Sequence, residues 1–169
     1  GAAPLARASK GSRVDVRPDH LGAPIVSKVL EQGPQLDPHD IEDVLCGCGR
    51  PGGEQGFNLA RAVSILARLD VPGTTVTRFC ASSLQTTRMA AHAIAAGEGD
   101  VFVSVGVECV PRVAHGMPDT PAQRNPRFAL GNPERYPALH VAMGQTAEHV
   151  ARRPGIPRGA HGGFALRRP

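Results

Sequence analysis

The chain has 169 residues, 41% of them hydrophobic and 20% charged, so it can bury one sizeable core, and wholesale disorder is excluded. A mild net charge of +4 with only 4% aromatic residues argues against a nucleic-acid surface, because base-stacking side chains are scarce. No apolar run approaches the roughly 20 residues that a membrane helix needs, and four cysteines in a chain this long predict reduced thiols in the cytoplasm.

The first segments alternate between helical and extended patterns. Apolar residues at helical spacing predict a helix over residues 21–32. Because Pro24 fits only the first helical turn, that helix is expected to start slightly after Leu21. A short apolar run predicts a buried strand over residues 41–48, and a second helix is expected over residues 55–69.

The alternation continues through the middle of the chain. Residues 74–79 are rich in β-branched side chains and predict a short strand, and residues 82–96 predict a third helix. Residues 100–107 form the clearest strand pattern, and their near-continuous apolar character is typical of a strand covered on both faces. This order of helices and strands predicts an α/β fold with a mostly parallel sheet.

The last third of the chain is less regular. Residues 111–137 are rich in proline, asparagine, arginine and glycine, which predicts a long loop. One more helix is expected over residues 141–151, before Pro154 and Gly155. Residues 157–169 have little periodicity, and we predict no element there.

Cys80 stands where the predicted strand 74–79 gives way to the predicted helix 82–96. In parallel sheets, ligand-binding residues gather at the carboxyl ends of strands. The free N–H groups and the positive dipole end of a helix N-terminus also favour a thiolate, the nucleophilic form of cysteine. We therefore predict that Cys80 is a catalytic nucleophile; the alternative is a buried structural thiol. His92, the nearest histidine in the sequence, would stand about 18 Å away along the helix, too far to act as its base.

Three ordered segments resemble the thiolases, the family of acetyl-CoA acyltransferases. They are residues 75–85 (TVTRFCASSLQ), 95–101 (AAGEGDV) and 106–112 (GVECVPR). Weaker similarity covers residues 11–18, 49–61 and 143–148 (MGQTAE), so nearly the whole chain is included. The resemblance is to the N-terminal portion of a thiolase. Residues 1–169 would form a partial, truncated N-terminal domain in which residues 111–150 are the substrate-loop region, and the C-terminal half would be absent.

The resemblance implies an acyltransferase of fatty acid metabolism that moves acyl groups between coenzyme A thioesters, by thiolysis or by Claisen condensation. Cys80 would take the acyl group as a thioester, and Met143 would line the acyl pocket; the alternative for Met143 is a side chain that fills a gap in the core. Acyl-CoA and coenzyme A are the implied partners, and a complete chain would form a homo-oligomer. No metal or redox cofactor is implied, and neither a nucleic acid nor a membrane is an expected partner.

Two alternatives remain open at this level. Cys46 and Cys48 are two positions apart on a predicted strand, so their thiols would face the same side, and one alternative is that they bind a metal ion together. No further ligands at suitable spacing are evident, and packing is the favoured role. For the chain as a whole, the alternative function is an inactive truncated thiolase remnant or a non-catalytic partner of a fuller thiolase chain.

Overall fold

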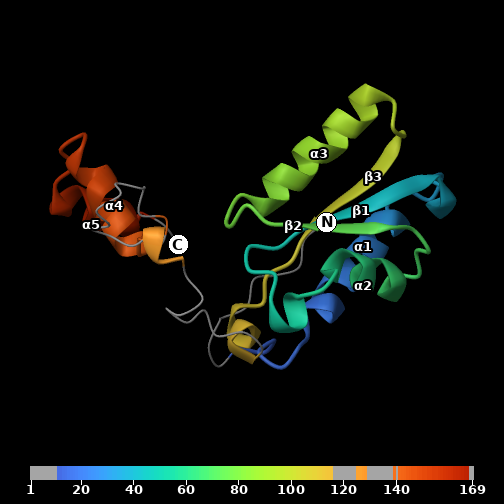
Figure 1. The fold of residues 1–169 in the computed structure, drawn as a ribbon, viewed down its shortest axis with the longest axis horizontal. Coiled ribbons are helices and arrows are strands. Elements are labelled where there is room, and N and C mark those ends of the chain that lie inside the picture. Colours follow the sequence, from blue (N-terminus) through green and yellow to red (C-terminus); the bar gives the residue numbers. More distant parts are fainter. Residues whose placement is uncertain (1–10, 116–124, 129–138, 140, 168–169) are drawn as a thin grey trace. The chain divides into compact units, whose positions relative to one another are not determined.

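A computed structural model describes residues 11–115, 125–128, 139 and 141–167. The chain divides into two compact units, Gly1–Pro118 and Asp119–Pro169. The first unit contains the helices α1 (Pro18–Glu31), α2 (Leu59–Leu66) and α3 (Ser82–Ala96) and the strands β1 (Ile41–Gly47), β2 (Gly73–Val76) and β3 (Val101–Gly106) (Figure 1).

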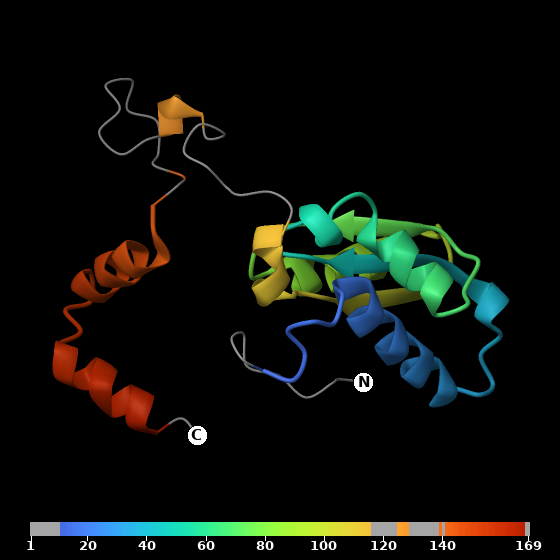
Figure 2. The ribbon, with the colours of Figure 1, turned by 90° about the horizontal axis from the view of Figure 1, so that it is seen from below.

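The three strands form one parallel sheet in the order β2-β1-β3. At its carboxyl edge, Gly47 of β1 is paired with Val76 of β2 on one side and with Gly106 of β3 on the other. Helix α3 covers one face of the sheet, and α1 and α2 cover the opposite face, in front of the strands when seen from below (Figures 1 and 2). The predicted α/β fold with a mostly parallel sheet is therefore confirmed.

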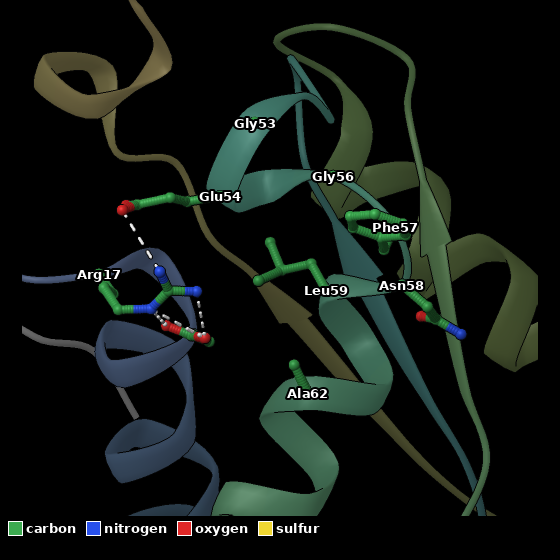
Figure 3. A pocket seen from close by; sticks show the side chains of 9 residues that line it. Arg17, Gly53, Glu54, Gly56, Phe57, Asn58, Leu59 and Ala62 are labelled. Carbon is green, nitrogen blue, oxygen red and sulfur yellow. Dashed lines mark hydrogen bonds and ion pairs between the residues drawn. The ribbon is translucent and has the colours of Figure 1, made fainter. Parts of the chain in front are cut away.

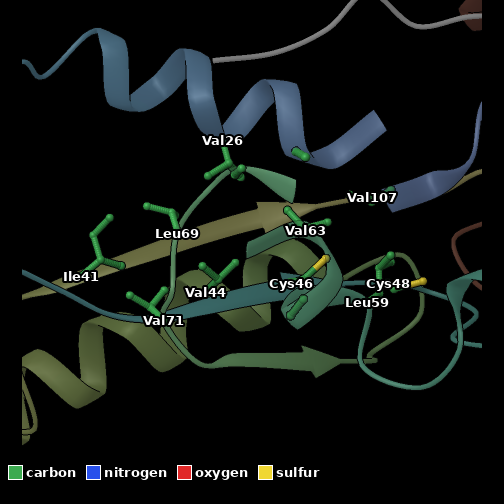
Figure 4. Close-up of a cluster of buried hydrophobic side chains, with 13 residues drawn as sticks. Val26, Ile41, Val44, Cys46, Cys48, Leu59, Val63, Leu69, Val71 and Val107 are labelled. Atoms are coloured by element: carbon green, nitrogen blue, oxygen red, sulfur yellow. The ribbon is translucent and has the colours of Figure 1, made fainter. Parts of the chain in front are cut away.

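The core lies between the sheet and the α1–α2 layer (Figure 4). Alternate residues of β1, namely Val44, Cys46 and Cys48 just past its end, point into it because successive side chains on a strand face opposite ways. Val63 of α2 and Val26 of α1 meet them from the helical layer, and both are almost fully buried. Burying one such valine stabilises the fold by about 1.5–3 kcal/mol relative to leaving it exposed.

Two helix boundaries differ from those expected. Helix α1 begins at Pro18, before Leu21, and contains Pro24 in its interior. Pro18 suits the first helical position, where no intrahelical N–H bond is needed. Pro24 removes one backbone hydrogen bond, and its ring crowds the preceding turn. Helix α2 is shorter than residues 55–69, because Asn58 caps its start by accepting a hydrogen bond from the Arg61 N–H, and it ends at Leu66.

The second unit contains the helices α4 (Met143–Arg152) and α5 (Arg158–Leu166). Helix α4 confirms the helix expected over residues 141–151. No element was expected over residues 157–169, and this expectation was wrong, because α5 occupies most of that segment. Its three glycines, Gly159, Gly162 and Gly163, carry no side chains and so conceal the helical period.

Only parts of the loop expected over residues 111–137 lie within the described residues. Those parts form two short 3-10 helices, Val110–His115 and Pro126–Phe128. Within the described ranges, every helix is too short or too polar to cross a membrane.

Candidate active site

Cys80 lies at the carboxyl edge of the sheet, in the connection that leads from β2 to α3. Its thiol is exposed, whereas Cys46, Cys48 and Cys109 are buried. The sequence-based placement at a strand-to-helix junction is therefore correct. The alternative of a buried structural thiol does not hold for this cysteine.

Two glycines in neighbouring strands allow the start of α3 to lie directly on the sheet. A Cβ atom on Gly47 would come within 2.6 Å of the Ser82 carbonyl carbon and the Ser83 backbone nitrogen. A Cβ atom on Gly106 would collide with the Ser83 hydroxyl. Because glycine has no Cβ, the first turn of α3 approaches the strand ends closely, and this contact fixes where Cys80 stands.

The turn that carries Cys80 is held by its own hydrogen bonds. The buried Ser82 hydroxyl accepts a bond from the Arg78 N–H at 2.8 Å and donates one to the Phe79 carbonyl at 2.6 Å. The Ala81 N–H donates to the Arg78 carbonyl at 3.0 Å. Phe79 itself has a φ of 47°, a left-handed conformation that costs a bulky residue energy and persists only where surrounding contacts impose it. The thiol of Cys80 is thus presented by a tight turn.

The N-terminus of α3 provides the electrostatic setting of this thiol. Cys80 precedes Ser82, the first residue of α3, by two positions. The Ala81 and Ser82 N–H groups are taken up by the Arg78 and Phe79 carbonyls, and the positive end of the helix dipole favours an anion at such a place. The geometry therefore suits a cysteine that attacks as a thiolate.

Met143 is the first residue of α4, in the second unit. Its side chain is 73% exposed, so it does not fill a gap in the core of its own unit. Cys80 belongs to the first unit, and each unit is described by itself. The acyl-pocket role of Met143 stays a prediction.

Sequence analysis did not single out Glu108 and Gln55, which are hydrogen-bonded to Gly49 and Arg50 just past the end of β1. Glu108 follows the carboxyl end of β3, and its carboxylate accepts hydrogen bonds from the Gly49 N–H and the Gln55 side-chain amide. Gln55 is almost completely buried. The position of Glu108 just past a strand end, at the same sheet edge as Cys80, was the available signal.

Cys46 and Cys48 pack in the core rather than facing solvent. Burial, together with the neighbouring Cys48, raises the pKa of Cys46 to about 12. Burial and the Glu108 carboxylate raise the pKa of Cys48 to about 11. In the part of the chain that the structure describes, no three histidine, cysteine or acidic side chains are grouped as metal ligands.

These buried thiols make folding sensitive to alkaline pH. An unfolded cysteine has a pKa of about 8.5, so above that pH the unfolded chain releases protons that the folded chain keeps. Stability present below pH 8.5 is therefore lost as the pH rises toward the pKa values of about 11 and 12. Urea unfolding should show a lower free energy of unfolding at about pH 10.5 than at about pH 8. In the double variant Cys46→Ala/Cys48→Ala, this difference between the two pH values should be smaller by at least about half. An equal drop in both proteins would contradict this prediction.

A separate hollow beside α1 and α2 contains an ion-pair cluster (Figure 3). Glu54 accepts two hydrogen bonds from the Arg112 guanidinium, at 2.5 and 2.6 Å, and lies 3.3 Å from Arg17. Arg17 also pairs with Asp19. The hydrogen bonds that Arg112 donates to the Glu54 carboxylate raise the pKa of Arg112 above its usual value. These charges satisfy one another and join segments distant in sequence, so the cluster is structural.

Comparison of the sequence with known proteins points to one family. Residues 2–168 match the family model for the thiolase N-terminal domain. The chain is 38% identical over 169 residues to a 3-ketoacyl-CoA thiolase of Bacillus subtilis (strain 168), a match that covers 97% of this chain and 41% of the relative. It is 38% identical over 168 residues to the 3-ketoacyl-CoA thiolase of Shewanella frigidimarina (strain NCIMB 400), with the same coverage. The chain thus spans about two fifths of the length of these curated relatives.

Proposed function

The chain belongs to the thiolase family, and from that premise we propose that it takes part in acyl transfer between coenzyme A thioesters, with Cys80 as the acyl-accepting nucleophile. The relatives named above are 3-ketoacyl-CoA thiolases, so a 3-ketoacyl-CoA is the proposed substrate. The observation that carries the proposal is the exposed thiol of Cys80 on a hydrogen-bonded turn at the N-terminus of α3.

The proposed reaction has two steps that share one covalent intermediate. The Cys80 thiolate attacks the 3-keto carbon, and the bond between C2 and C3 breaks. The electron pair left on C2 takes a proton, which releases acetyl-CoA, and the remaining acyl group stays on Cys80 as a thioester. The thiol of a coenzyme A molecule then loses its proton and attacks this thioester, so acyl-CoA leaves and the Cys80 thiolate returns. The proton released here balances the proton taken up at C2 in the first step. The reverse sequence is the condensation. The cleavage needs no external oxidant or reductant, because the electron pair of the broken bond stays on C2, and the proposal includes no metal or redox cofactor.

The remaining features of the proposal concern substrate and assembly. Met143, at the start of α4, would contact the acyl chain, where a flexible thioether adapts to apolar groups of different shape. For a complete chain, a homo-oligomer is the proposed assembly. The four cysteines are free, which fits a compartment that keeps thiols reduced, and we propose the cytoplasm.

Consumption of acetoacetyl-CoA by the purified chain in the presence of coenzyme A tests the proposed activity. Turnover that depends on both substrates would support it. If the chain is inactive alone and also leaves Cys80 unacylated, the proposal fails for this chain. The non-catalytic alternative predicts a different outcome: no acylation of Cys80, but stable association with a full-length thiolase during size-exclusion chromatography.

A further inference from the structure

We propose that Glu108 is a positioning residue for Cys80, which it holds in place through Gly49. The inference rests on the proposed function, because it assigns Glu108 a role only if the place of Cys80 matters. Three observations support it: the hydrogen bond between Glu108 and Gly49, the hydrogen bond between Gly49 and the residues before Cys80, and the left-handed conformation of Phe79.

The first link is a clamp on the segment that follows β1. One carboxylate oxygen of Glu108 accepts the Gly49 N–H at 2.7 Å, and the other accepts the Gln55 side-chain N–H at 2.8 Å. Gln55 is only 1% exposed and is fixed at both ends of its amide. Its nitrogen also donates to the Arg50 carbonyl at 3.0 Å, and its oxygen accepts the Cys109 N–H at 2.5 Å. A bond from a backbone N–H to a carboxylate is stronger than a neutral one, so Gly49 is held firmly.

The second link joins Gly49 to the turn that carries Cys80. The Gly49 carbonyl accepts a hydrogen bond from the Thr77 hydroxyl at 3.1 Å. A Cβ atom on Gly49 would lie 2.8 Å from the Glu108 carboxylate and 3.3 Å from the Phe79 carbonyl. Gly49 therefore fills the narrow space between Glu108 and the residues that precede Cys80.

The third link is the conformation of Phe79, directly before Cys80. Its φ of 47° is unfavourable for a bulky side chain and needs support from its surroundings. The Thr77 hydroxyl is hydrogen-bonded to Gly49, and the Phe79 carbonyl would lie 3.3 Å from a Cβ atom added there, so the support reaches the turn from the Glu108 side. Loss of the clamp would let this turn relax and move Cys80 away from the N-terminus of α3.

Alkylation of Cys80 by iodoacetamide in the full chain tests this role without any substrate. Cys80 is the exposed cysteine of the four, so the rate reports on it directly. Glu108→Gln keeps the size of the side chain but places an NH₂ group against one of the two N–H donors. It is expected to lower the alkylation rate about tenfold. Thr77→Val, which removes the hydroxyl bond to Gly49, should lower the rate about threefold. The matched control is Glu98→Gln, which changes an exposed carboxylate after the far end of α3 and should leave the rate unchanged.

The direction in which the alkylation rate of Cys80 changes distinguishes a positioning role of Glu108 from its other possible roles. If Glu108 acted only through its negative charge, its removal would raise the alkylation rate instead of lowering it. A merely structural role would lower the urea midpoint and leave the rate of the folded protein unchanged. Either result would overturn the proposal, and if Glu108→Gln does not fold, Thr77→Val decides alone. Failure of the proposed function would appear separately, as absent turnover while the effect of Glu108 on alkylation persists.

Discussion

Replacing Cys80 with serine is expected to lower thiolysis of acetoacetyl-CoA by at least about 10³-fold, because the covalent intermediate cannot form efficiently on a hydroxyl. Serine has almost the same size as cysteine, and the turn around Cys80 is held by backbone groups and by Ser82. The variant should therefore keep the fold and lose the chemistry. Steady-state turnover of the variant and of the original chain, at equal concentration, measures the effect.

The matched control is Cys109→Ala, which also removes one thiol from the first unit. Cys109 is buried, and its sulfur contacts the Val16 carbonyl rather than the exposed turn. The turnover of the Cys109→Ala variant per folded molecule should stay within about twofold of the turnover of the original chain, since the Cys109 side chain touches no reacting atom. A Cys80→Ser variant that retains most of the turnover would remove Cys80 from the chemistry.

Replacing Gly47 with alanine is expected to destabilise the first unit by about 3 kcal/mol, at the upper end of the usual range for over-packing. The new methyl group would lie 2.6 Å from two backbone atoms of α3, the Ser82 carbonyl carbon and the Ser83 nitrogen. Backbone cannot rotate aside as a flexible side chain can, so α3 must move off the sheet. Chemical denaturation followed by circular dichroism measures the loss of stability.

Gly33→Ala is the control for this second substitution. Gly33 lies after the end of α1, and a Cβ atom there would meet nothing within 4 Å. Its free energy of unfolding should change by no more than about 0.5–1 kcal/mol. If both glycine variants were equally stable, the close approach of α3 to the strand ends would not govern the placement of Cys80.

Much of the fold was accessible from the sequence because the first unit follows simple periodicities. The strand over residues 100–107 appears as β3, and the helix over residues 82–96 matches α3 at both ends. Cys80 was located for the same reason: the change from an extended to a helical pattern marks a sheet edge, and the resemblance to thiolases covered that segment.

The parts that escaped prediction depend on contacts that a one-dimensional pattern does not record. Helix α5 was missed because its glycines add no apolar period. The start of α1 was misplaced because Pro24, a residue that usually breaks helices, lies in its interior. The clamp made by Gln55 and Glu108 joins residues 53 positions apart, and only the folded sheet edge brings them together.

The most direct test of the central claim is the mass of the peptide that contains Cys80 after brief exposure of the chain to an acyl-CoA, with an acid quench and digestion. We expect this peptide to gain the mass of one acyl group, and hydroxylamine should remove the group because it is a thioester. The peptides that contain the buried Cys46, Cys48 and Cys109 should remain unchanged. An unmodified Cys80, or acylation spread equally over all four cysteines, would contradict the assignment of Cys80 as the acyl-accepting nucleophile.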